Sequence, residues 1–77
     1  MPTLAEYEAL VEKAERGGYP PASQDRDAAI RSLIRDICAA RWDREQERSQ
    51  AQALVFRLEQ VRRRGAVCLT YLADGVG

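Results

Sequence analysis

Residues 23–64 contain neither glycine nor proline, so no strong helix breaker interrupts this long stretch. Positions at alternate steps of three and four residues run through it without a slip, and such positions share one face of a helix. All of them are apolar except Arg44 and Glu47, which are neighbours in the series. The pattern predicts helix on both sides of residues 42–50. Its positions are Ile30, Leu33, Ile37, Ala40, Arg44, Glu47, Ala51, Leu54, Leu58 and Val61.

The polar segment WDREQERSQ, residues 42–50, leaves two arrangements open. The unbroken spacing favours one long helix over about residues 24–64, with Arg44 and Glu47 as polar positions in a seam between two chains. The alternative is a helical hairpin in which Asp43 caps the second helix. Adjacent apolar pairs such as Leu33 and Ile34 widen the apolar faces, which suits packing against two neighbours. We favour the long helix.

The flanking segments complete an all-α prediction for a single domain over residues 1–77. Thr3 and Glu6 have the spacing of a capping box, and Gly17-Gly18 ends the apolar helical pattern, so a helix is expected over residues 3–16. Residues 19–22 contain two prolines and predict an extended connector, after which Ser23 is the expected N-cap of the next helix. Residues 66–73 predict a short helical or extended segment.

The composition argues against an enzyme and against a metal or cofactor site. The chain has no histidine, and its two cysteines, Cys38 and Cys68, lie in separate segments. We expect both to be reduced, buried thiols. The commonest general base and the usual zinc-ligand spacings are therefore missing, so we predict no catalytic, cofactor-binding or metal-binding residues. No apolar run is long enough to span a bilayer, which predicts a soluble, cytoplasmic protein.

A chain of 77 residues buries only a modest core, so its apolar faces predict self-association. We expect a homodimer built on residues 28–64. Tryptophan beside arginine is also the composition of a protein-binding hot spot. The predicted function is therefore a non-enzymatic module that occludes or bridges sites on a protein target. The predicted dimer interface is Ile30, Leu33, Ile37, Ala51, Leu54, Leu58 and Val61, and the predicted partner-binding residues are Trp42, Arg41, Arg44, Arg48 and Phe56.

Two other functions fit parts of the sequence. Arg62, Arg63 and Arg64 could bind an anion, which would suit a nucleic-acid-associated regulator that also uses Arg57. Twelve basic and twelve acidic residues cancel, however, and this neutrality disfavours a dedicated nucleic-acid binder. The three arginines also suit the cationic C-terminus of a helix. In size, neutrality and lack of motifs, the chain resembles small accessory and inhibitor proteins of bacteriophages, including anti-CRISPR proteins. The resemblance is one of general character and not of residue pattern. It implies an inhibitor that binds protein.

Overall fold

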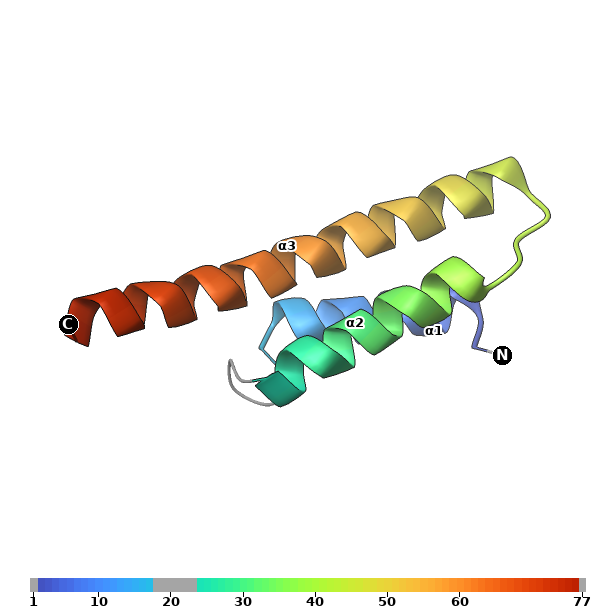
Figure 1. Ribbon diagram of the computed structural model, residues 1–77. Coiled ribbons are helices and arrows are strands. Elements are labelled where there is room, and N and C mark those ends of the chain that lie inside the picture. The colour runs from blue at the N-terminus through green and yellow to red at the C-terminus, as the bar shows by residue number, and fades with distance from the viewer. Residues whose placement is uncertain (1, 18–23, 77) are drawn as a thin grey trace.

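The computed structural model describes residues 2–17 and 24–76, with side chains described for residues 2–17 and 25–64. Three helices make up this part of the chain: α1 (Leu4–Glu15), α2 (Gln24–Ala39) and α3 (Glu45–Val76). They form a rod with principal extents of 50 × 18 × 18 Å. The predicted all-α class is confirmed (Figure 1). The predicted connector over residues 19–22 and the predicted cap at Ser23 lie outside the described residues.

Helix α1 lies where the sequence predicts, one residue shorter at each end than the expected range 3–16 because Thr3 and Arg16 are its caps. The Thr3 side chain accepts a hydrogen bond from the Glu6 amide, and the Glu6 carboxylate accepts one from the Thr3 amide, so the capping box is formed. At the other end Gly17 has a φ of 81°, and its amide donates to the Ala14 carbonyl. Glycine suits this left-handed position because it has no Cβ to clash.

The long helix that we favoured over residues 24–64 is wrong, and the hairpin alternative is confirmed. Helix α2 ends at Ala39 and α3 begins at Glu45, with a turn over residues 40–44. The Arg44 carbonyl accepts the first helical hydrogen bond of α3, from the Arg48 amide, so the cap position is one residue later than the predicted Asp43. Folding back lets the apolar face of α2 cover that of α3 within one chain, which a straight helix cannot do.

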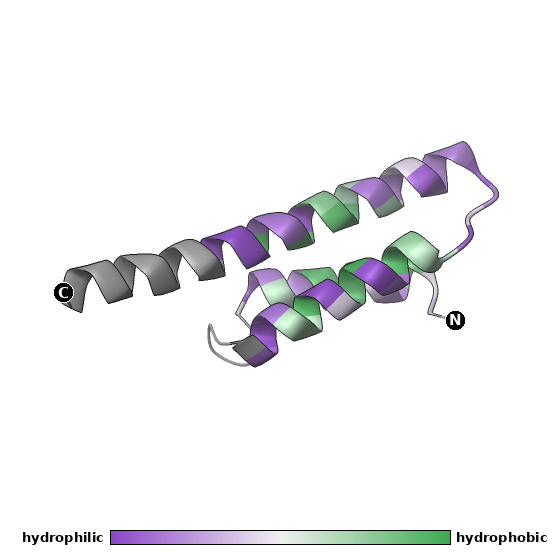
Figure 2. Ribbon diagram, viewed as in Figure 1, coloured by the Kyte–Doolittle hydropathy of each residue, from purple (hydrophilic) through white to green (hydrophobic). Residues whose placement is uncertain are grey.

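Helix α3 is the centre of the fold. It packs against both α1 and α2, whereas those two helices contact each other far less. Its buried stripe is therefore shared between two neighbours, as the wide apolar faces predict. The residues that pack between the helices are apolar, and the turn is mostly polar (Figure 2). The core consists of Tyr7, Val11, Ala14, Ile30, Leu33, Ile37, Ala51, Leu54, Leu58 and Val61.

Residues 65–76 continue α3 and do not form a separate segment. We call them the C-terminal extension. Of the two options left open for residues 66–73, the helical one is therefore right, and Gly65 lies inside the helix. The red part of α3 in Figure 1 extends beyond the ends of α1 and α2. Within the described residues, no helix combines the length and apolar character needed to cross a membrane.

Candidate functional site

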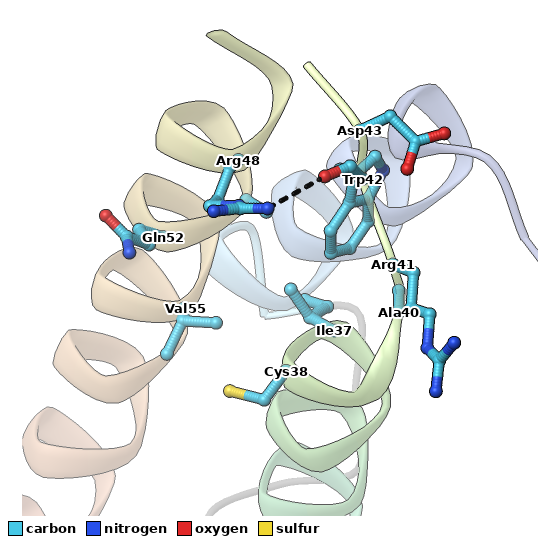
Figure 3. A pocket seen from close by; sticks show the side chains of 10 residues that line it. Ile37, Cys38, Ala40, Arg41, Trp42, Asp43, Arg48, Gln52 and Val55 are labelled. Carbon is cyan, nitrogen blue, oxygen red and sulfur yellow. Dashed lines mark hydrogen bonds between the residues drawn. The ribbon is translucent and has the colours of Figure 1, made fainter. Parts of the chain in front are cut away.

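An open groove of about 600 Å³ lies beside the turn between α2 and α3. We call it the turn-end groove. Its base is apolar, because Ile37 and Ala51 belong to the core and Val55 is half-buried against it. A second hollow of about 370 Å³ adjoins it through three shared residues, and its other two lining residues, Glu45 and Ser49, are polar. The turn-end groove is lined by Ile37, Cys38, Ala40, Arg41, Trp42, Asp43, Arg48, Ala51, Gln52 and Val55 (Figure 3).

Trp42 is held in place from the side of α1. Its ring meets that of Tyr7 edge to face, with centroids 6.1 Å apart and planes at 69°. Such a geometry adds specific attraction to the burial of both rings. Tyr7 is only 2% exposed, and its burial raises the pKa of its hydroxyl, with the charges of Asp36 and Glu6 adding to the effect. Tyr7 therefore stays neutral at physiological pH and anchors a tryptophan that remains half-exposed.

Arg48 ties the start of α3 to the turn. Its guanidinium donates a hydrogen bond of 3.4 Å to the Trp42 carbonyl (Figure 3). Arg41 and Asp43 point away from this contact in the same view, and all three charged residues are exposed. The groove thus has an apolar base and a charged rim with two cations and one anion.

Three of the five predicted partner-binding residues meet at this groove. Trp42, Arg41 and Arg48 line it, whereas Arg44 is exposed but does not. Phe56 is 62% exposed and also lies outside the lining. It follows Val55 in α3 and is one helical turn from Gln52, so it lies close to the rim of the groove.

Sequence reasoning did not select five lining residues as members of a site: Cys38, Ala40, Asp43, Gln52 and Val55. In a straight helix Cys38 and Gln52 are far apart, and only the turn brings them to one groove. The hairpin alternative could have identified them, because it places the end of α2 beside the start of α3. Cys38 is a free thiol, but it is exposed, so the expectation that it is buried is wrong. The side chain of Cys68 lies outside the described residues.

The seven residues predicted to form a dimer interface are all buried within one chain. Helices α1 and α2 cover the stripe on α3, and α3 covers the stripe on α2. These residues therefore build the core of a single chain, and an assembly through them would require the hairpin to open. A homodimer formed through another surface stays a prediction.

The arginine cluster does not lie at a helix C-terminus, because α3 continues to Val76. Arg62 is half-buried, whereas Arg63 and Arg64 are exposed. Arg57 is already engaged: its Nε donates to Glu15 Oε2 at 3.0 Å, and its Nη2 pairs with Glu15 Oε1. This contact lowers the pKa of Glu15 and raises that of Arg57, in each case mainly through the hydrogen bond between them. The pair joins α3 to α1 and occupies one of the cations that a phosphate contact would need.

The groove therefore combines an apolar base with a charged rim. Among the residues that the structure describes, no three cysteine or acidic side chains gather into a group that could hold a metal ion. No protein-family model matches the chain, and neither the curated proteins nor the solved structures contain a significant match to it.

Proposed function

We propose that the protein is a non-enzymatic protein-binding module whose binding surface is the turn-end groove together with Phe56. The observation that carries this proposal is an open apolar groove beside a half-exposed tryptophan, with arginines at its rim. Fully desolvated tryptophan and arginine carry much of the energy at protein interfaces. We call the groove and Phe56 together the turn-end surface.

The apolar base of the groove supports a target that inserts an aliphatic or aromatic side chain. Such a side chain would contact Val55 and Trp42 and lose its exposure to water, which contributes roughly 1.5–3 kcal/mol for a large residue. Arg41 and Arg48 favour a carboxylate on the target next to that side chain. A short target segment with an apolar anchor and an adjacent acidic residue therefore fits the surface best.

The surface is also pre-organised for binding. Trp42 is held by Tyr7 on one side, and its carbonyl is held by Arg48 on another. A side chain that is already ordered loses little further freedom on association, and this saving appears directly as affinity. A small protein that binds in this way can occlude the site that it covers on its target.

Affinity capture from the native host, followed by mass spectrometry, tests the proposal. The variant R41E/F56D changes two exposed positions of the turn-end surface, and A28D/R35E makes the same change in net charge at exposed positions of α2 outside it. We expect a target that is retained by the wild type and by A28D/R35E and is lost with R41E/F56D. Equal retention by both variants would show that the turn-end surface is not the binding site.

The emission of Trp42 gives a second readout, because it is the only tryptophan in the chain. A target that enters the groove must change the surroundings of this indole. Titration of the captured target should therefore shift the emission of the wild type and of A28D/R35E at the same target concentration. An unchanged emission on saturation would place the target elsewhere.

A further inference from the structure

Within the part of the chain that the structure describes, the C-terminal extension is a helix that no other helix covers. Its twelve residues span about 18 Å at 1.5 Å per residue. Among the described side chains, the core ends at Val61, and Figure 1 shows the rest of α3 extending beyond α1 and α2. The extension lies at the opposite end of the rod from the turn-end groove.

The spacing that makes α3 pack continues into this extension. The core positions Ala51, Leu54, Leu58 and Val61 follow one another at steps of three, four and three. The next positions of the series are 65, 68 and 72, which are Gly65, Cys68 and Leu72. Residues 66–73, AVCLTYLA, contain no charge. The register of the core stripe thus runs on for three turns past the helices that cover it.

We propose that a second copy of the chain covers the extension, through antiparallel packing of two extensions about a two-fold axis. Full overlap places residue 65 of one copy level with residue 76 of the other. Each extension then covers the continued stripe of the other copy, up to the ends of α1 and α2 in that copy. A two-fold axis closes this arrangement, because the same segment serves both sides of the interface.

The charges that flank the extension select the antiparallel direction. Arg62, Arg63 and Arg64 precede it, and Asp74 lies near its end. Antiparallel overlap brings Asp74 of one copy within about one helical turn of the arginines of the other, at both ends of the interface. Parallel packing would instead set the two arginine runs side by side, and like charges at close range repel.

The pairing deepens the proposed function. Its bridging role rests on that function, because it requires the turn-end surface to bind a target. Two rods of 50 Å that overlap by their extensions give a dimer about 80 Å long, with a turn-end surface near each end. Such a dimer can bridge two target sites as well as occlude one. Its interface is small, so we expect an equilibrium between monomer and dimer that depends on protein concentration.

Sedimentation velocity over a range of protein concentrations tests the pairing. We expect the wild type to rise from the monomer mass of 8.7 kDa towards twice that value. Leu72→Glu, at a position of the stripe, should abolish the rise. Val67→Glu makes the same kind of change about 140° away around the helix and should leave it intact. A wild type that stays monomeric into the millimolar range, or equal behaviour of the two variants, would overturn the pairing.

The two native cysteines provide an independent test with a short bismaleimide cross-linker. In the antiparallel pair the two Cys68 positions are offset by five residues along the helix axis, about 7.5 Å, whereas the two Cys38 thiols lie near opposite ends of the dimer. Cys38→Ser should therefore still give a covalent dimer, and Cys68→Ser should not. The reverse result would contradict the pairing. A monomer that still captures its target refutes the pairing alone, and a dimer that captures none refutes the proposed function alone.

Discussion

Leu58→Ala should destabilise the protein far more than any change on the exposed side of α3. Leu58 is fully buried in the stripe that faces both α1 and α2. The substitution removes three carbon atoms, which contribute about 0.8 kcal/mol each when buried, and it leaves a cavity that adds to the loss. We expect a decrease of about 3 kcal/mol in the free energy of unfolding. A chain of this length has a total of roughly 4–12 kcal/mol, so the loss is a large share.

Urea denaturation followed by far-UV circular dichroism and by Trp42 emission measures this loss. With a slope near 1 kcal/mol per molar urea, typical of small proteins, the midpoint should fall by about 3 M. The midpoints from both signals should fall by the same amount, because Trp42 packs against the same three-helix core.

Phe56→Ala is the matched control on the same helix. Phe56 is 62% exposed, so its removal should change the free energy of unfolding by no more than about 0.5 kcal/mol. A loss for Phe56→Ala as large as that for Leu58→Ala would refute the hairpin packing, because it would show that the exposed face of α3 is buried in solution.

Three further changes test the two ends of α1 and the ion pair that joins α1 to α3. Glu15→Gln removes the pair with Arg57 and should cost up to about 1 kcal/mol at neutral pH, since the pair is partly exposed. The pKa of Glu15 is lowered in the folded state, so this contribution is present above the unfolded pKa of about 4.3 and is lost as the pH falls through the folded value. Chemical denaturation at neutral pH and near pH 2 should show a difference between wild type and variant only at neutral pH. Gly17→Ala should cost about 1 kcal/mol by thermal denaturation, because the backbone φ of 81° strains any side chain there. Thr3→Ala should cost a similar amount in the same assay, because it removes an N-cap.

Local chemistry made α1 predictable from the sequence. The capping box, the apolar spacing and the glycine after the last turn all act within a few residues of one another, and each was found in place. The ion pair of Asp27 with Arg31 is local in the same sense and forms at 2.9 Å. Such features depend little on the rest of the fold, so the sequence pattern suffices to locate them.

The turn was less predictable because its residues have no strong local preference for it. Arg44, Glu45 and Glu47 are compatible with a helix interior, and the apolar spacing kept its phase across the segment by coincidence. What decides the turn is tertiary: α3 needs two covering helices, and Trp42 gains a contact with Tyr7 by leaving the helix. These contributions come from residues distant in sequence, which no window of one helix contains.

The same tertiary decision explains the candidate site. Trp42, Arg41 and Arg48 could be selected from composition, because tryptophan and arginine are typical of protein interfaces whatever the fold. Their apolar base could not, since Ile37 and Val55 line one groove only when the chain folds back. The hairpin thus has two consequences for association. It buries the stripes of α2 and α3 within one chain, and it leaves α3 longer than the helices that cover it. The two proposals accordingly place association at the two ends of the rod, target binding at the turn-end surface and pairing of two copies at the C-terminal extension.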